Sequence, residues 1–440
     1  MDNTLDFIDQ ASFLGLRALG HGPVIQYTWL YSHDVDLEAL RRFHRNLGGG
    51  LLGRRIERSP LPFGRHRWIA WPGPADLTVE PSARPRAEVF GWLDGQAALP
   101  IDPERGPSFR LAVQPIAEGG AAVSLVFSHT VADGIGGMVS VVDAVTGRMR
   151  ELGYPASGRT AKLPVLLADS RRFIREIPAM VRAAVALAKL TRARKDSLSP
   201  PVRAVRVEEH QPDRVVTVPA VTVYADAQVW DERAAALGGT STSLFIGVTA
   251  RLGGRLGWVN GDGRVEVTVP VNERTEDDTR GNALTQVSVI ADPDEVCDDL
   301  SAVRAEVKAA LSRLSEARHE LLAPLPLAPV VPKALARRLE GMVINTGIIG
   351  SSNLGELDPV AIRPDGTEAE YFAVRMCERL TLSAIARTGG SFFPVVTGRF
   401  SGKVFISIGY TNAADTITRE ELAQYVRATL VDFDLTATVE

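Results

Sequence analysis

The chain has 440 residues, a formal net charge of −4 and 45% hydrophobic residues. A charge this close to zero gives no support for nucleic-acid binding, and no run of 18 apolar residues predicts a membrane-spanning helix. Residues 1–6 lack the basic start of a signal peptide. Cys297 and Cys377 lie far apart without metal-ligand spacing, which favours free thiols in a reducing compartment. These features predict a cytoplasmic globular protein and agree with an enzyme, and the length predicts two domains.

Predicted strands and helices alternate through the first third of the chain. Residues 24–31 are apolar, aromatic and β-branched, which predicts a strand. Asp36 then precedes a helix whose apolar residues recur at spacings of three and four, and the glycines at 48–50 end it. A strand at 68–71 and a helix through 89–93 follow. This alternation is typical of α/β or α+β folds.

His129 stands at the junction of a predicted strand and a predicted helix. Residues 121–127 form an apolar, β-branched run, and a helical pattern follows over 135–145. Asp133 can cap this helix and place a carboxylate beside its positive end, and Gly134 permits a tight turn. A side chain at such a turn is held rigidly and faces a cleft. Because imidazole titrates near neutral pH, His129 is the candidate catalytic residue among the seven histidines.

A basic connector separates the two halves of the chain. Residues 169–206 contain ten basic and three acidic side chains, and 178–190 are rich in small and aliphatic residues. Arg175, Arg182 and Lys189 recur every seven residues, which places them on one stripe of a helix. The favoured interpretation is an amphipathic linker helix packed on the body with a solvated basic edge. The alternatives are an interfacial helix on an anionic bilayer, or a dock for the phosphates of a ligand or for an acidic protein.

The second half repeats the alternation of strands and helices. Its expected elements are strands at 215–218, 221–224, 265–269 and 404–410, helices at 243–256 and 300–314, and a last helix capped by Thr418. Residues 321–332 contain four prolines, which exclude an ordinary helix or a central strand. This segment is expected to be an ordered loop over the core, with an apolar rim that guides the chain of an apolar ligand as the alternative.

Motifs for several other chemistries are missing from the sequence. It contains no Gly-x-x-x-x-Gly-Lys phosphate loop, no His-Glu-x-x-His zinc helix and no Gly-x-Ser-x-Gly nucleophile. Without a placed nucleophile, a covalent enzyme intermediate is disfavoured, and direct reaction between two substrates remains.

The motif His-Thr-Val-Ala-Asp-Gly at 129–134 resembles the His-x-x-x-Asp-Gly signature of the CoA-dependent acyltransferase superfamily. This superfamily includes chloramphenicol acetyltransferase, the condensation domains of peptide synthetases, and the wax ester synthase/diacylglycerol acyltransferase and polyketide-associated branches. Residues 107–111 are similar to the family's approach to the signature strand. Residues 269–274 with 280–282 are similar to its Pro-Val-x-x-Arg…Gly-Asn segment, and 351–355 to its Ser-Asn motif.

The resemblance implies an α/β (α+β) fold of two chloramphenicol-acetyltransferase-like sandwich domains. The two domains would form a pseudo-dimer with the active site at their interface. On this view residues 1–157 form the N-terminal domain, 158–205 a basic helical connector, and 206–440 the C-terminal domain.

The resemblance also implies roles for individual residues. His129 would be the general base, and Asp133 and Gly134 would be structural, with Asp133 paired to Arg274. A role for Asp133 in orienting the imidazole is the alternative. The expected substrate-binding residues are Ser351, Ser352 and Asn353. Two of them, Ser352 and Asn353, are candidate donors to the oxyanion, as are backbone N–H groups. No metal and no bound cofactor are expected, since an acyl-CoA or carrier-protein thioester serves as co-substrate.

Two departures from the family pattern bear on the choice of branch. Ser128 stands where many relatives have a first histidine, and no Asp-Phe-Gly-Trp-Gly segment is present. This favours the wax ester synthase-like, polyketide-associated or condensation-like branches.

Three functions stay open at the level of the sequence. They are an ester-forming acyltransferase, a stand-alone condensation enzyme that forms an amide, and a non-catalytic relative that binds acyl chains or carrier proteins. The expected partners are an acyl thioester donor, which includes an acyl carrier protein, and a small-molecule or lipid acceptor. Peripheral contact with a membrane is left open, and nucleic acid is not expected.

Overall fold

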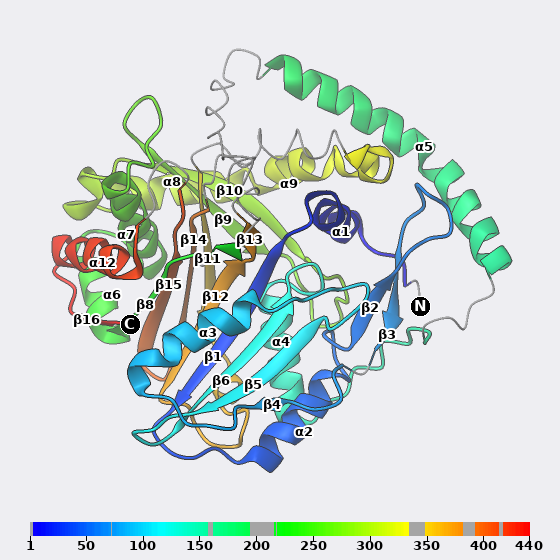
Figure 1. Cartoon of the computed structure of the whole chain (residues 1–440). Helices are drawn as coiled ribbons and strands as arrows, with labels where there is room; N and C mark the ends of the chain where they lie inside the picture. The colour runs from blue at the N-terminus through cyan, green and yellow to red at the C-terminus, as the bar shows by residue number, and fades with distance from the viewer. Residues whose placement is uncertain are drawn as a thin grey trace, which may run out of the picture.

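The computed structural model describes residues 3–71, 73–156, 162–193, 215–216, 218–333, 348–381, 392–412 and 417–440. They form two lobes, each built on one large sheet (Figure 1). In the part of the chain that is described, no helix is long and apolar enough to cross a membrane.

The first lobe is a five-stranded sheet in the order β12-β1-β6-β5-β4. Its strands are β1 (Pro23–Tyr31), β4 (Thr78–Val79), β5 (Phe109–Pro115), β6 (Ala121–Ser128) and β12 (Tyr371–Glu378). Its helices are α2 (Leu37–Leu47), α3 (Val89–Ala98) and α4 (Gly134–Thr146). Phe43 of α2 and Val141 of α4 share a buried cluster with Tyr27, whereas Leu93 of α3 is buried with Leu30. Because neighbouring strand residues face opposite sides, α2 and α4 cover one face and α3 the other.

The second lobe is a seven-stranded sheet in the order β10-β9-β11-β14-β15-β8-β16. Its strands are β8 (Ala220–Asp226), β9 (Val265–Asn272), β10 (Leu284–Ala291), β11 (Ile348–Glu356), β14 (Pro394–Phe400), β15 (Lys403–Gly409) and β16 (Ala437–Val439). Its helices are α6 (Ala227–Ala236), α7 (Ser241–Arg255), α8 (Ser301–Ser312) and α12 (Arg419–Asp432), whose apolar residues pack on one face. From the other face, Val396 and Phe405 join the core of the first lobe, so the lobes share apolar packing.

Smaller elements complete the two lobes. Two short sheets pair β2 (Arg54–Glu57) with β3 (Arg67–Ala70), and β7 (Val215–Val216) with β13 (Leu380–Thr381). The remaining helices are α1 (Phe7–Leu19), α5 (Lys162–Ala193), α9 (Leu314–Leu322) and the 3₁₀ turns η1 (Arg86–Glu88), η2 (Glu295–Cys297), η3 (Leu325–Val330) and η4 (Pro359–Ile362).

Strand β12 crosses from the second half of the sequence into the sheet of the first lobe. It pairs antiparallel with β1, and Met376 lies opposite Ile25 while Val374 lies opposite Tyr27. The two lobes are therefore joined through a continuous backbone ladder as well as by packing. The sequence does not predict this exchange, because nothing in the composition of 371–378 distinguishes it from a strand of its own half.

Several local predictions are confirmed. Asp36, Asp133 and Thr418 are the N-caps of α2, α4 and α12, and Thr418 forms a capping box with Glu421. The predicted loop at 321–332 is wrong in part, since α9 extends through Leu322 and a 3₁₀ helix follows. A 3₁₀ helix accommodates these prolines because it is short and tolerates missing N–H donors near its start.

The predicted domain boundaries lie outside the described residues, at 157/158 and 205/206. Helix α5 occupies the predicted connector and confirms that this segment is helical over its described part.

Candidate active site

His129 follows β6 directly and precedes α4 by four residues. Its backbone N–H donates to the carbonyl of Pro23 (3.1 Å), and its carbonyl accepts from Nδ2 of Asn282 (3.3 Å). The backbone is thus fixed by the start of β1 and by a loop of the second lobe. Within the described part of the chain the imidazole makes no hydrogen bond. The backbone is therefore held in place, and the ring is left available for a substrate.

A cavity of about 310 Å³ lies where the lobes meet, and His129 is in its wall. Six of the seven predicted site residues line it: His129, Asp133, Gly134, Ser351, Ser352 and Asn353. The rest of the wall is mainly apolar and comes from both lobes. Its apolar members are Ile25, Ile135, Pro270, Leu284, Leu354, Val374, Met376 and Val396. The structure therefore brings the predicted residues together beside an apolar space, and η3 contributes nothing to its lining.

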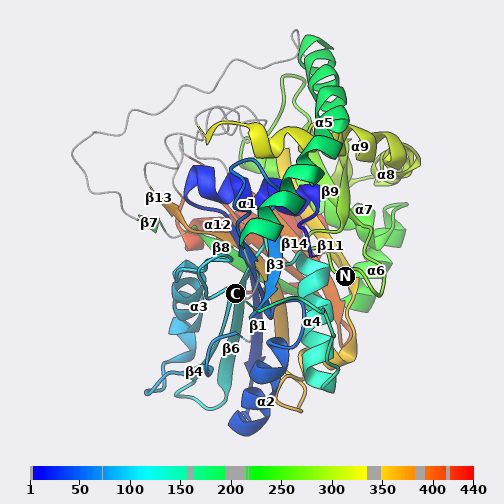
Figure 2. The ribbon, with the colours of Figure 1, turned by 90° about the vertical axis from the view of Figure 1, so that its right-hand side faces the viewer.

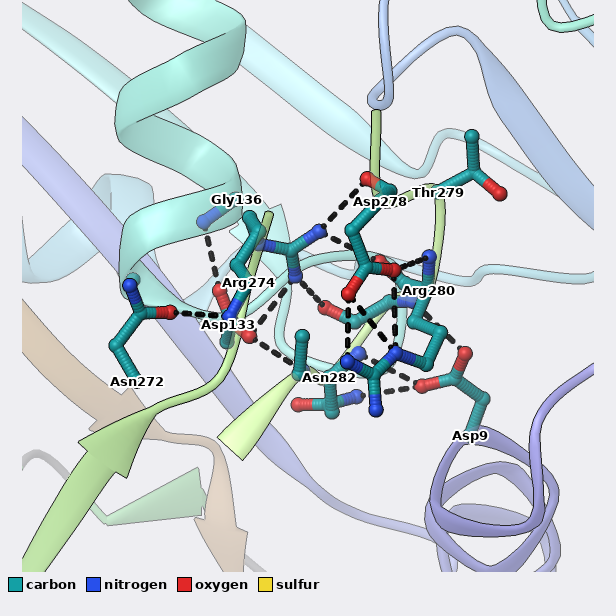
Figure 3. Close-up of polar contacts among 12 residues, drawn as sticks. Asp9, Asp133, Gly136, Asn272, Arg274, Asp278, Thr279, Arg280 and Asn282 are labelled. Atoms are coloured by element: carbon teal, nitrogen blue, oxygen red, sulfur yellow. Dashed lines mark hydrogen bonds and ion pairs between the residues drawn. The ribbon is translucent and has the colours of Figure 1, made fainter. Parts of the chain in front are cut away.

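Asp133 is bound by groups other than His129 (Figure 3). Its Oδ1 accepts from the N–H of Gly136 (2.6 Å), and its Oδ2 accepts from Nη2 of Arg274 (2.9 Å) and from the N–H of Ala283 (2.8 Å). The side chains of Asp133 and Arg274 are only 5% and 3% exposed. The predicted ion pair is confirmed, and the alternative in which Asp133 orients the imidazole is wrong for this structure.

Arg274 also holds the loop that follows it. Its Nη1 donates to the carbonyls of Asp278 (3.2 Å) and Arg280 (2.9 Å), and its Nη2 donates to that of Gly281 (3.0 Å) as well as to Asp133. One buried guanidinium thus fixes both the cap of α4 and the loop at 278–281. Such multiple, directed donation is what distinguishes arginine from lysine at a buried site.

Asp9 of α1 clamps the same loop from the other side. Its fully buried carboxylate accepts from the N–H groups of Gly281 and Asn282 (2.8 Å each) and from Nδ2 of Asn282 (3.1 Å). Asn282 in turn reaches the carbonyl of His129. Burial raises the pKa of Asp9 to about 6, against the opposing effect of these donors and of Arg54.

Asp9 should make the stability of the protein fall as pH rises from about 4 to about 6. The carboxyl binds its proton more tightly in the folded state, with a pKa of about 6, than in the unfolded state, where aspartate titrates at about 3.9. Stability from this group is therefore lost as pH passes the folded pKa. Urea unfolding between pH 4 and 7 should show that the free energy of unfolding of wild type falls relative to that of Asp9→Asn as pH rises. A difference that is constant across this range would contradict the prediction.

Gly281→Ala should destabilise the protein by about 1–3 kcal/mol, the usual cost of overpacking. A Cβ at this position would lie 2.8 Å from Oδ1 of Asp9 and 2.9 Å from the carbonyl of Thr130. Thermal and urea unfolding measure the loss. The matched control is Gly261→Ala, where the added Cβ meets nothing within 4 Å. Equal losses of stability in Gly281→Ala and Gly261→Ala would show that the contacts with Asp9 and Thr130 do not restrict residue 281.

Glycines at the start of α4 allow close packing rather than an unusual backbone. Gly134 does not have a positive φ, so its turn does not need the backbone freedom of glycine. A Cβ there would lie 3.1 Å from Cδ2 of Leu354 across the cavity, and one on Gly137 would lie 2.3 Å from the Phe127 ring. Tyr27 donates its hydroxyl to the carbonyl of Gly134, and burial raises its pKa so that it stays protonated.

The three predicted substrate-binding residues differ in how they are engaged. Ser351 is fully buried and donates to the carbonyl of Thr268 (3.2 Å). Asn353 donates to the hydroxyl of Thr242 (3.3 Å) and accepts from the N–H of Gly355 (2.9 Å). The hydroxyl of Ser352 makes no hydrogen bond to any described residue. Because strand side chains alternate, Ser352 faces the side opposite to its two neighbours.

Sequence reasoning missed Asp9 and Arg54. Arg54 is fully buried, stacks 3.9 Å above the Trp68 ring, and donates to the carbonyls of Thr279 and Val131 (2.8 Å to the latter). Both residues bind backbone groups near His129 and the loop of the second lobe. Asp9 looks like an ordinary acid in the first turn of a helix, and Arg54 lies in a run of mixed polarity, so neither carries a local signal. No cluster of three or more metal-ligating side chains is found among the described residues.

No family model and no curated protein matches the chain in sequence. The first condensation domain of the calcium-dependent antibiotic synthetase, in complex with a substrate analogue, is similar in structure with a TM-score of 0.59. Its sequence identity is 16%, over 98% of this chain and 97% of that one. The chain has the fold of a condensation domain.

Two further solved structures share this condensation-domain fold. Polyketide synthase associated protein 5 from Mycobacterium tuberculosis has a TM-score of 0.54 at 14% identity, over 98% of each chain. The starter condensation domain of rhizomide synthetase has a TM-score of 0.55 at 15% identity, over 98% of this chain and 94% of that one. The predicted α/β fold with two chloramphenicol-acetyltransferase-like lobes is confirmed.

Proposed function

We propose that this condensation-domain-like protein is an acyltransferase that moves an acyl group from a thioester to a hydroxyl group. The observation that carries the proposal is the position of His129. Its imidazole lines the cavity between the lobes, its backbone is fixed from both of them, and its ring makes no hydrogen bond to a described residue.

In the proposed reaction His129 is the general base. The acceptor hydroxyl gives its proton to the imidazole while its oxygen attacks the thioester carbonyl, and a tetrahedral oxyanion forms. The oxyanion collapses, the C–S bond breaks, and the imidazolium returns the proton to the thiolate. The unengaged hydroxyl of Ser352 is the side chain that we propose as oxyanion donor. Asp133 and Arg274 hold the turn and do not touch the reacting atoms.

The apolar wall supports an aliphatic acyl group as the part of the donor that this cavity receives. Apolar side chains from β9, β10, β11, β12 and β14 surround the space beside His129. Burying hydrocarbon here would contribute roughly 0.8 kcal/mol for each methylene. The thioester is a co-substrate in this proposal, carried by CoA or by an acyl carrier protein.

Amide formation is the second candidate. An amine acceptor requires the same base, and two of the structures that share the fold are condensation domains of peptide synthetases. We rank the ester first on the motif resemblance alone. A non-catalytic binding role is less favoured, because the His129–Asp133–Gly134 motif is intact and its cavity is present.

Thiol release by the purified protein tests the proposal. Acyl-CoA thioesters of increasing chain length, and the same acyl groups on a carrier protein, are offered with alcohols and with amines, and product masses separate ester from amide. We expect acceptor-dependent release with alcohols, and faster turnover as the acyl chain lengthens toward the capacity of the cavity. Release that is no faster with any acceptor than without one would overturn the assignment.

A further inference from the structure

Helix α5 lies at the periphery of the molecule, away from both large sheets (Figures 1 and 2). Six of its large aliphatic side chains are between 43% and 67% exposed: Leu163, Leu167, Ile174, Ile177, Val181 and Val185. Their successive spacings of 4, 7, 3, 4 and 4 put them on one face of the helix. We call these six residues the apolar stripe. It extends over roughly 33 Å at 1.5 Å per residue.

The charges of α5 are sorted between its inner and outer sides. Its two acids face the body, where Asp169 pairs with Arg67 and Glu176 pairs with Arg65 (3.0 Å). Met180 and Ala183 are buried on this side as well. The outward side of the described helix consequently carries no carboxylate.

Exposed arginines run along one edge of the apolar stripe. Arg171, Arg175 and Arg182 are exposed, and none makes an ion pair within the described residues. At 100° per residue they lie about a quarter turn from the stripe. We call these three residues the basic flank. The outer surface of α5 thus has an aliphatic face, the apolar stripe, and beside it a cationic face, the basic flank.

A cavity of about 530 Å³ opens beside the basic flank, between α5, α9 and η3. Arg182 lines it together with Arg318 and His319 of α9, and Arg318 also pairs with Glu273 (3.0 Å). Its other lining residues from α5 are Ala179, Ala183 and Ala186, so the cavity lies between the helix and the body.

We infer that α5 docks the protein on a membrane rich in anionic phospholipid. The apolar stripe enters the boundary between headgroups and acyl chains, and the basic flank binds headgroup phosphates. Amphipathic helices bind interfaces through this combination of buried aliphatic area and cationic side chains. A symmetric contact between the α5 helices of two copies fits less well, because the outer face of the described helix offers no carboxylate to the flank. The inference stands on α5 and does not depend on the acyl-transfer proposal.

Vesicle flotation of the full chain tests the basic flank. We expect binding to phosphatidylcholine vesicles containing a quarter phosphatidylglycerol, and weaker binding to phosphatidylcholine alone. The variant Arg171→Gln/Arg175→Gln/Arg182→Gln should bind the anionic vesicles roughly a hundredfold less tightly, at about fivefold per arginine. High salt should also weaken the binding of wild type to the anionic vesicles, because it screens the arginines from the headgroups. The matched control is Arg42→Gln/Arg45→Gln/Arg304→Gln, which removes three exposed arginines elsewhere.

A second variant tests the apolar stripe. Leu167→Ser/Ile174→Ser/Val181→Ser should abolish vesicle binding at low salt as well as high salt. The control, Val229→Ser/Leu311→Ser/Val431→Ser, changes aliphatic residues that are 43–70% exposed on other helices and should bind as wild type. Because all these positions are exposed, the variants should fold, and their turnover of water-soluble thioesters should equal that of wild type.

Three outcomes would overturn the inference. The first is a wild-type chain that does not bind the anionic vesicles, or control variants that lose binding equally. The second is a dimer that the stripe variant dissociates without any vesicle binding, which would make a second copy the occupant. The third is a flank variant that raises the KM for the acyl donor and binds vesicles normally, which would assign the arginines to the donor.

Discussion

Replacing His129 with alanine should lower acyl-transfer turnover by about 10²–10⁴-fold, the usual contribution of a positioned general base. The imidazole is the group that accepts the acceptor's proton in the proposed mechanism, and no other described histidine lines the cavity. The substitution should leave the fold intact. The two hydrogen bonds that fix this residue, to Pro23 and Asn282, use its backbone rather than its ring.

Steady-state thiol release and product formation measure the loss, and circular dichroism with thermal unfolding checks the fold. His33→Ala is the matched control, since this exposed histidine contacts Thr367 far from the cavity. A folded His129→Ala variant with turnover near that of wild type would exclude the general-base role. A general loss of activity in both variants would indicate an unspecific effect of removing a histidine.

Removing one partner of the Asp133–Arg274 pair should cost about 3–5 kcal/mol of stability, because the other charge is left buried and unpaired. Asp133→Asn leaves Arg274 without its counter-ion. Arg274→Met leaves Asp133 without its counter-ion and also removes the donors to the carbonyls of the loop at 278–281. Both side chains are almost fully buried. The double variant should lose less than the sum of the single losses, since no uncompensated charge remains.

Urea unfolding of the two single variants and the double variant completes the cycle. The exposed pair of Glu420 and Arg427 provides the control, at 3.2 Å with side chains 70% and 49% exposed. Glu420→Gln should change the free energy of unfolding by about 0–1 kcal/mol. An effect of Asp133→Asn that is no larger than this would show that the pair does not stabilise the interface.

Local structure near His129 is predictable because its determinants are close together in the sequence. A strand, a cap and a helix within 25 residues place His129 and Asp133, and the matched segment at 269–274 predicts the partner of Asp133. Asp9 is different, because it binds Gly281 from 272 positions away. Its single carboxylate in a helical first turn carries no sign of that contact.

The three residues of the Ser-Asn motif differ in their hydrogen bonds. All three are polar and adjacent, so the sequence does not predict which of them the rest of the protein engages. Ser351 and Asn353 hydrogen-bond to Thr268 and Thr242, whereas Ser352 hydrogen-bonds to no residue that the structure describes. In the same way, the composition of α5 predicts an amphipathic helix packed on the body, but not that its aliphatic face is the exposed one.

The exchanged strand β12 also sets the order in which the chain can complete its first lobe during synthesis. Strand β1 has β6 on one side as soon as residue 128 has emerged, but its other neighbour lies at 371–378. At ribosomal speeds of roughly 5–20 residues per second, that edge waits on the order of ten to fifty seconds for its partner. During this interval an apolar strand presents unpaired N–H and C=O groups, which are a template for pairing with another chain. The yield of folded protein should therefore depend on how well the open edge of β1 is kept from pairing with other chains until residues 371–378 have been made.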